Sequence, residues 1–253
     1  MENNEILRTE NLTIDFNGFI AVNKLDMTVN KNEIVGIIGP NGAGKTTFIN
    51  LLSGYYKPVS GKIIFEDKDI TKLSIEKRIF LGISRTFQLV SVFPNLTVLE
   101  NMTIAYYKKM NLNNVLFKSL KEKTSLACNK YKKIKDYLEL FEFTHIANKL
   151  VKNIPMGIKR ELEVAMVLIK DPKILFLDEP FAGLGDEEID KLLILLRRFT
   201  NKKTVILIEH KISKIKDFVE RIVVMNEGKK IADGNFDDVL KSQQVRKAYW
   251  RIN

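Results

Sequence analysis

The first part of the chain alternates between hydrophobic and polar residues. ILRTENLTIDF (residues 6–16) and IAVNKLDMTV (residues 20–29) carry this pattern, which predicts two short antiparallel strands. GKIIFEDKDIT (residues 61–71) has the pattern of a further hairpin arm. The alternation therefore predicts an antiparallel β layer near the N-terminus.

Three later runs are apolar almost throughout. They are EIVGIIG (residues 33–39), KILFLDEP (residues 173–180) and TVILIEH (residues 204–210). Such runs are typical of strands that are buried on both faces, as in a parallel sheet. RIVVMNEGKKIADG (residues 221–234) predicts a hairpin that turns at residues 226–228.

Segments with helical periodicity alternate with these runs. TTFINLLSGYY (residues 46–56) predicts a helix directly after the first apolar run. In residues 159–170, one helical face collects Leu162, Ala165, Met166 and Ile169. In residues 186–199, one face collects Ile189, Leu192, Leu193 and Leu196. Strands that alternate with helices predict an α/β core with a mostly parallel sheet.

Residues 91–152 differ from the rest of the chain. This stretch is rich in lysine, contains no glycine and has a helical pattern. We interpret it as a helical subdomain that is inserted into the α/β core.

Composition and charge limit the class of protein. The 253 residues are 45% hydrophobic, which is enough for a sizeable core, and the one cysteine, Cys128, excludes an intramolecular disulfide framework. MENNEILRTE lacks the features of a signal peptide, and no apolar run reaches the ~18 residues that a membrane span needs. We therefore expect a cytoplasmic protein in a reducing compartment.

The net charge of +10 has two interpretations. It can reflect an anionic partner, such as a nucleotide, a nucleic acid or the inner membrane surface. It can also reflect a lysine-rich, solvated surface, because the lysines are spread along the chain.

A phosphate-binding loop lies between the first apolar run and the helix that follows it. GPNGAGKTT matches the pattern G-x-x-x-x-G-K-[ST] and has the strand–loop–helix context that the pattern requires. Its glycines let backbone N–H groups surround phosphate oxygens. Lys45 is expected to reach the β- and γ-phosphates, and the Thr46 hydroxyl is expected to bind Mg²⁺. The predicted nucleotide-binding residues here are Gly39, Pro40, Asn41, Gly42, Ala43, Gly44, Lys45, Thr46 and Thr47.

Acidic residues follow the second apolar run. Asp178 is expected to hold Mg²⁺, directly or through water, and Glu179 to polarise a water for attack on the γ-phosphate. His210 follows the third run, so it is expected at the same edge of the sheet. We predict that it senses the γ-phosphate and fixes Glu179. Lys45, Glu179 and His210 are thus the predicted catalytic residues.

Together, these motifs resemble the ATP-binding cassette ATPases that power transporters, over nearly the whole chain. The resemblance implies a P-loop NTPase (RecA-like) α/β core with an antiparallel β subdomain and an inserted helical subdomain. It implies one ATPase domain over residues 1–253, with the core and β subdomain in residues 1–90 and 166–253. The helical subdomain would span residues 91–165 and end in the family's signature loop.

The resemblance also assigns two further residues. Phe16, in IDFNGF, matches the aromatic residue that stacks on adenine, although a phenylalanine in a strand is more often part of a core. Gln88, in SRTFQ, matches the residue between the core and the helical subdomain that senses Mg²⁺ and the transporter. The implied ligands are ATP and Mg²⁺.

Within this family, the chain is most similar to the ATPases of branched-chain amino acid importers. The segments that carry the likeness are GFIAVNKLDMTV, SRTFQLVSVFPNLTVLENM, FAGLGDEE, the helical insert and the C-terminal VRKAYW. The expected partners are a second ATPase subunit in a heterodimer, two transmembrane permeases and an extracytoplasmic solute-binding protein, at the cytoplasmic face of the inner membrane. An ATPase of lipopolysaccharide export and a regulatory subunit with weak hydrolysis are alternatives. A nucleic-acid-binding cassette protein is not expected, because those relatives usually carry two cassettes.

The signature loop departs from the family pattern. In the family, two cassettes face head to tail, and the loop, typically L-S-G-G-Q, contacts the ATP held by the other cassette. The matching residues here are Ile154, Pro155, Met156, Gly157 and Ile158. Pro155 lacks both the serine hydroxyl and a backbone N–H, and one hydrogen bond to a charged group contributes about 1.5–3 kcal/mol.

We expect this loop to be weakened rather than absent. Proline is tolerated at a helix start, Gly157 keeps its N–H, and Lys159 and Arg160 are expected to add positive charge. Gly185 is a second departure, because the family usually has Asn or Asp there, and Asp186 is the residue that could substitute. The chain's own ATP site is therefore predicted to be complete, and the site that it completes in its partner is predicted to be weak.

Overall fold

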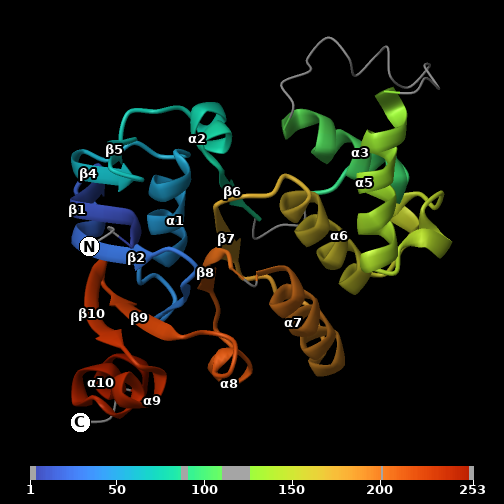
Figure 1. Cartoon of the computed structure of the whole chain (residues 1–253). Coiled ribbons are helices and arrows are strands. Elements are labelled where there is room, and N and C mark those ends of the chain that lie inside the picture. The colour runs from blue at the N-terminus through green and yellow to red at the C-terminus, as the bar shows by residue number, and fades with distance from the viewer. Residues whose placement is uncertain (1–3, 87–90, 110–125, 201, 251–253) are drawn as a thin grey trace. The chain divides into compact units, whose positions relative to one another are not determined.

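The computed structural model describes residues 4–86, 91–109, 126–200 and 202–250 (Figure 1). These residues form two compact units, each built from segments that are distant in the sequence. The first unit consists of Met1–Arg85, Lys173–Ala182 and Leu196–Asn253. The second consists of Thr86–Pro172 and Gly183–Leu195.

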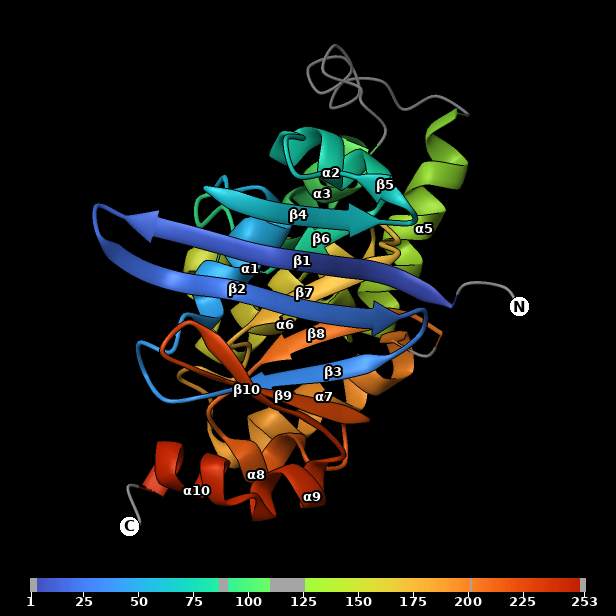
Figure 2. The same ribbon diagram turned by 90° about the vertical axis from the view of Figure 1, so that its left-hand side faces the viewer.

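The first unit contains the antiparallel sheet that the alternating pattern predicted. Its strand order is β2-β1-β4-β5, and Figure 2 shows β4, β1 and β2 side by side. The strands are β1 (Glu5–Phe16), β2 (Phe19–Asn30), β4 (Ser60–Phe65) and β5 (Lys68–Asp69). Alternate apolar side chains such as Leu12, Val22 and Ile63 are completely buried, which explains the period of two.

The second sheet of this unit has the order β10-β9-β3-β8-β7-β6. All neighbours are parallel except β9 and β10, which form the predicted hairpin. The strands are β3 (Ile34–Ile38), β6 (Ile83–Arg85), β7 (Ile174–Asp178), β8 (Thr204–Ile208), β9 (Arg221–Asn226) and β10 (Lys229–Gly234). The parallel register brings the ends of β3, β7 and β8 to one edge, where the predicted site residues begin.

Helix α1 follows the phosphate loop and is shorter than predicted. It ends at Ser53 because Gly54, at φ 84°, adopts a left-handed conformation that terminates the helix. Tyr55 and Tyr56 therefore lie outside it. Among the described residues, the helices that lie wholly in this unit are α1 (Lys45–Ser53), α2 (Ile75–Leu81), α8 (Ile212–Ile215), α9 (Phe236–Lys241) and α10 (Gln243–Trp250).

The second unit is helical, as the pattern of residues 91–152 predicted. It contains α3 (Val98–Lys109), α5 (Leu126–Leu140), the short 3₁₀ helices η1 (Thr144–Ile146) and η2 (Val151–Asn153), and α6 (Met156–Leu168). It also contains the first part of α7 (Asp186–Thr200), which continues into the first unit. The predicted apolar face of α7 is buried, whereas α6 also buries charged residues, including Glu161 and Glu163.

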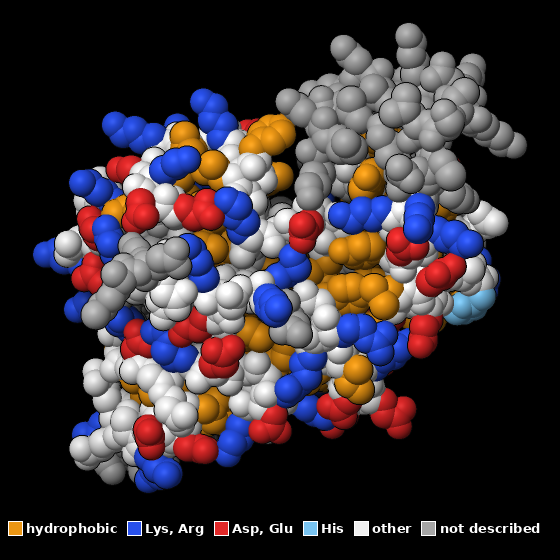
Figure 3. All heavy atoms as spheres, in the orientation of Figure 1, with side chains coloured by type: hydrophobic (Ala, Val, Ile, Leu, Met, Phe, Trp, Pro, Cys, Tyr) orange, Lys and Arg blue, Asp and Glu red, His pale blue; other side chains and the backbone are white. Residues whose placement is uncertain are grey.

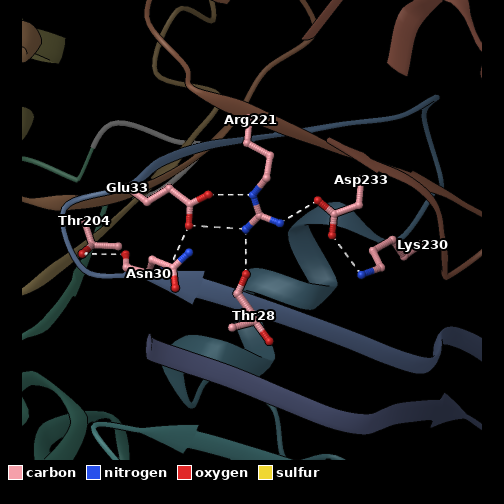
Figure 4. A network of polar contacts seen from close by, with 7 residues as sticks. All are labelled: Thr28, Asn30, Glu33, Thr204, Arg221, Lys230 and Asp233. Atoms are coloured by element: carbon pink, nitrogen blue, oxygen red, sulfur yellow. Dashed lines mark hydrogen bonds and ion pairs between the residues drawn. The ribbon is translucent and has the colours of Figure 1, made fainter. Parts of the chain in front are cut away.

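Arg221, at the start of β9, links the two sheets of the first unit (Figure 4). Its guanidinium donates to Glu33 and Asp233 at 2.6 Å each and to the Thr28 carbonyl of β2 at 2.6 Å. Arg221 pairs with Val35 near the beginning of β3, so this network lies at the opposite end of β3 from the phosphate loop.

On the face drawn in Figure 3, the described Lys and Arg side chains are interspersed with Asp and Glu side chains. Among the residues that the structure describes, none of the helices combines the length and the apolar character that crossing a bilayer requires.

Arg78 of α2 stabilises the C-terminal end of the phosphate-loop helix. The side chain is 1% exposed, and Nη1 donates to the carbonyls of Leu51 (2.7 Å) and Leu52 (2.8 Å). Nη2 donates to the Thr71 carbonyl at 2.9 Å. Burial lowers the pKa of Arg78 to about 10, so the guanidinium remains charged and satisfies the unpaired carbonyls of the helix end.

Replacing this arginine is expected to destabilise the first unit. Arg78→Met should lower the free energy of unfolding by about 3 kcal/mol, because buried carbonyl groups lose their donors. Urea denaturation followed by circular dichroism measures this. Arg8→Met is the control, since Arg8 forms partly exposed pairs with Glu5 and Glu10 and should cost less than about 1 kcal/mol. Equal losses in the two variants would contradict this role of Arg78.

Candidate nucleotide site and signature segment

The phosphate loop joins β3 to α1, and at Gly44 its backbone has a conformation that favours glycine. Gly44 has φ 95°, and a Cβ there would lie 2.2 Å from the Ala21 carbonyl oxygen. Within the loop, the Ala43 N–H donates to the Pro40 carbonyl at 3.2 Å. The residues predicted from the motif, 39–47, all lie in this loop and in the first turn of α1.

Lys45 is held inside the loop. Its side chain is 6% exposed, and Nζ donates to the carbonyl oxygens of Gly39 (2.8 Å) and Pro40 (3.0 Å). Burial lowers the pKa of Lys45, and the negative charges of Glu179 and Asp178 oppose this shift. The loop lysine and both predicted acidic residues are therefore close enough to interact.

Asp178 ends β7 and is completely buried. The Thr46 hydroxyl donates to its Oδ1 at 3.4 Å, and Arg85 Nη2 donates to its Oδ2 at 3.2 Å. Burial raises the pKa of Asp178, and the positive charge of Arg85 opposes this shift. A hydroxyl and a carboxylate oxygen side by side are hard oxygen ligands of the kind that Mg²⁺ prefers, so these residues fit the predicted ion.

Glu179 and His210 lie close together at the sheet edge where β7 and β8 end. His210 Nε2 lies 3.2 Å from Glu179 Oε1. Glu179 adopts a left-handed backbone (φ 49°), and its N–H donates to the Ile208 carbonyl at 3.0 Å. The backbone thus turns sharply where β7 ends, and the carboxylate is directed to the histidine that follows β8.

Glu209 is a residue that the sequence prediction missed. It is 3% exposed and accepts hydrogen bonds from the N–H groups of Phe181 (2.8 Å) and His210 (3.0 Å). Burial raises its pKa, and these backbone donors oppose the shift. Glu209 therefore fastens the turn after Glu179 to the segment that carries His210. An acidic residue directly after an apolar strand was the available signal.

Of the two residues assigned by resemblance, Phe16 and Gln88, the structure describes only Phe16. Phe16 is 41% exposed, and its ring lies edge-on to Tyr56 with 5.3 Å between centroids. An exposed aromatic face is compatible with stacking and does not fit a core residue. Gln88 lies outside the described residues.

The signature segment forms the start of α6. The helix begins at Met156, and Pro155 occupies the N-cap position without a side-chain hydrogen bond. Ile154 is buried and Met156 is 46% exposed. The loop is therefore folded, but it lacks the side-chain acceptor that a serine would give the first turn.

Glu188 of α7 lies against this first turn. Its Oε2 accepts the Gly185 N–H at 2.9 Å, which caps α7 in the manner of a capping box. Its Oε1 lies 2.2 Å from the place that a Cβ on Gly157 would occupy. The absence of a side chain at Gly157 thus makes room for a carboxylate, which is a structural reason for this glycine.

Arg160 does not add positive charge to the loop, and that expectation was wrong. Its side chain is 3% exposed, and Nη1 forms an ion pair with Glu163 at 3.0 Å, so the charge is buried and neutralised. Lys159 is partly exposed, and Nζ donates to the Lys152 carbonyl at 3.4 Å.

A parallel sheet with a phosphate loop between β3 and α1 and acidic residues at the end of β7 defines a P-loop NTPase. The family model described as ABC transporter matches residues 22–182. The chain therefore belongs to the ABC transporter family, and it is an ATP-binding cassette ATPase.

Several relatives match almost the full chain. The high-affinity branched-chain amino acid transport ATP-binding protein BraF of Pseudomonas aeruginosa is 37% identical, over 96% of this chain and 97% of its own length. The probable branched-chain amino acid transport ATP-binding protein LivG of Archaeoglobus fulgidus is 36% identical, over 97% and 95%. The lipopolysaccharide export system ATP-binding protein LptB of Haemophilus influenzae is 32% identical, over 96% of both chains.

Solved structures show the same fold. A nucleotide-free ATP-binding cassette from an ABC transporter has a TM-score of 0.84 and 30% sequence identity, and the match covers 97% of this chain and 98% of that one.

Because Glu188 lies against Gly157, we expect the effect of Gly157→Ala on stability to depend on Glu188. Ala is favoured over Gly inside a helix by about 1 kcal/mol, so Gly157→Ala should stabilise the Glu188→Ala protein by that amount. In the wild-type background, the new methyl group displaces the Glu188 carboxylate and the gain should disappear. A double-mutant cycle by chemical denaturation measures the coupling, expected at about 1 kcal/mol. Equal effects in both backgrounds would show that the two residues do not interact.

Proposed function

We propose that this chain is the ATP-hydrolysing subunit of a membrane importer for branched-chain or other amino acids. One observation carries the proposal: Lys45, Thr46, Asp178, Glu179 and His210 lie together at one edge of the parallel sheet. The similarity to BraF and LivG supports the amino acid substrate.

The roles of these residues follow from their chemistry. The loop N–H groups and Lys45 bind the β- and γ-phosphates, because they are positive groups at the start of a helix. Phe16 stacks on the adenine with its exposed ring. Glu179 accepts a proton from the attacking water, and His210 holds the Glu179 carboxylate in place.

In this proposal Thr46 and Asp178 would hold Mg²⁺, with Gln88 as a further ligand. Bound there, Mg²⁺ would supply positive charge for the phosphate oxygens. Asp178 is suited to this position because its second oxygen is already paired with Arg85.

We infer that the chain works in a heterodimer with a second ATPase subunit. Its own site has every predicted catalytic group, whereas the signature segment has Pro155 in place of serine and a carboxylate, Glu188, beside Gly157. Most turnover then takes place at this chain's phosphate loop, completed by the partner's signature loop.

The remaining partners are two permeases and an extracytoplasmic solute-binding protein, and the chain lies at the cytoplasmic face of the inner membrane. In this proposal residues 1–253 form one ATPase domain, with residues 91–165 as its helical subdomain. A lipopolysaccharide exporter is the second candidate, supported by the 32% identity to LptB. Transport assays with radiolabelled leucine distinguish the two, because only an importer raises uptake.

Two variants of the intact complex test the assignment of the sites. Glu179→Gln should abolish Mg²⁺-dependent ATP hydrolysis but leave ATP binding intact, since the general base is lost and the phosphate contacts remain. Pro155→Ser should leave the turnover unchanged, because the site that it completes contributes little. Phosphate release and binding of a fluorescent ATP analogue are the two measurements.

The opposite pattern would refute the heterodimer proposal. If substitution of the corresponding glutamate in the partner subunit abolishes turnover and Glu179→Gln does not, the partner holds the working site. Loss of about half of the turnover in each single glutamate variant would instead argue for two equivalent sites.

A further inference from the structure

Arg85 joins β7, the strand that ends in Asp178, to the phosphate-loop helix α1. It ends β6, and its guanidinium is 10% exposed. Nη1 donates to Asn50 Oδ1 (2.5 Å) and Ser53 Oγ (3.0 Å), both on α1. Nη2 donates to Asp178 Oδ2 at 3.2 Å, on β7. One side chain thus connects three elements of the first unit.

The residues of α1 that take part in these contacts lie on one helical face. Thr46, Asn50 and Ser53 are separated by four and three residues, a spacing that aligns side chains along a helix. Thr46 bonds to one oxygen of Asp178, and the other two bond to the arginine that holds the second oxygen. Residues of α1 therefore reach both oxygens of the carboxylate, one directly through Thr46 and the other through Arg85.

We propose that Arg85 is a positioning residue for Asp178. By holding Oδ2, it directs Oδ1 toward the Thr46 hydroxyl and thereby orients the pair that binds Mg²⁺. The inference rests on the proposed function, because it assigns Arg85 to the magnesium site of that same nucleotide pocket.

The geometry requires a forked side chain. A guanidinium has several N–H groups in a fixed plane, so one residue can bond to α1 through Nη1 and to Asp178 through Nη2. A lysine keeps the positive charge but presents a single nitrogen, which cannot bridge both elements in the same way. Arg85→Lys therefore separates the effect of position from the effect of charge.

The test measures how strongly Mg²⁺ improves nucleotide binding. A fluorescent ATP analogue is titrated into the purified chain with Mg²⁺ and with EDTA, and the ratio of the two affinities is compared among variants. In Arg85→Lys and Arg85→Met, the ratio should fall about tenfold, the effect of losing one hydrogen bond to a charged group. Binding in EDTA should change less than binding with Mg²⁺, because the N–H groups and Lys45 of the phosphate loop remain.

Further variants keep the test decisive. Ser53→Ala removes only one anchor of the guanidinium and should lower the ratio less, which covers the case in which the Arg85 variants do not fold. Arg221→Met is the matched control, since it removes another arginine with three partners, at the opposite end of β3, and should leave the ratio unchanged.

The outcomes separate the two proposals. A normal ratio in Arg85→Lys would show that only the charge of residue 85 matters and would overturn the positioning role. An equal fall in Arg221→Met would overturn it too, because the effect would then be a general loss of stability. If the wild-type chain binds no nucleotide, or binds it without any response to Mg²⁺, it is the proposed function that fails.

Discussion

The pairing of one buried carboxylate is the constraint on which the nucleotide site depends. Asp178 is completely buried at the end of β7, and an unpaired charge there would cost several kcal/mol. Its oxygens are therefore bonded to Thr46 of α1 and to Arg85 of β6. These contacts fix the phosphate-loop helix against two neighbouring strands. Asp178 pairs with Ile208 in the parallel register of β7 and β8, and Glu179, directly after Asp178, lies 3.2 Å from His210.

A second carboxylate governs the signature segment. Glu188 caps α7 through the Gly185 N–H and lies over Gly157 at the start of α6. Pro155 removes a donor from this helix start, and Glu188 adds a negative charge beside it. In the proposed function both features would weaken the attraction of this loop for a phosphate group, so they would act in the same direction. The proposed difference between the chain's own ATP site and its signature segment is thus explained by helix-capping interactions.

The sequence predicted the sheets and the grouping of the phosphate loop, Asp178, Glu179 and His210 because their signals are local. Apolar runs, alternation and the glycine-rich loop each depend on neighbouring residues, and β3, β7, β8 and the hairpin of β9 and β10 followed from them. It missed the three-residue strand β6 and the residues whose role depends on distant contacts. Arg85 and Glu209 look like unremarkable charged residues until their partners are known. The end of α1 was misplaced because Gly54 adopts a left-handed conformation that ends the helix before Tyr55 and Tyr56, and Arg160 was misassigned because its burial depends on tertiary packing.

The central claim is that this chain has a competent ATP site and a weak signature loop. The most direct measurement is Mg²⁺-dependent ATP hydrolysis by the purified chain alone, compared with Pro155→Ser and Glu179→Gln. In that preparation both sites use this chain's own signature loop. The account predicts ATP binding with low turnover, which Pro155→Ser raises about tenfold and Glu179→Gln abolishes. Wild-type turnover that vanishes in Glu179→Gln and that Pro155→Ser leaves unchanged would contradict it.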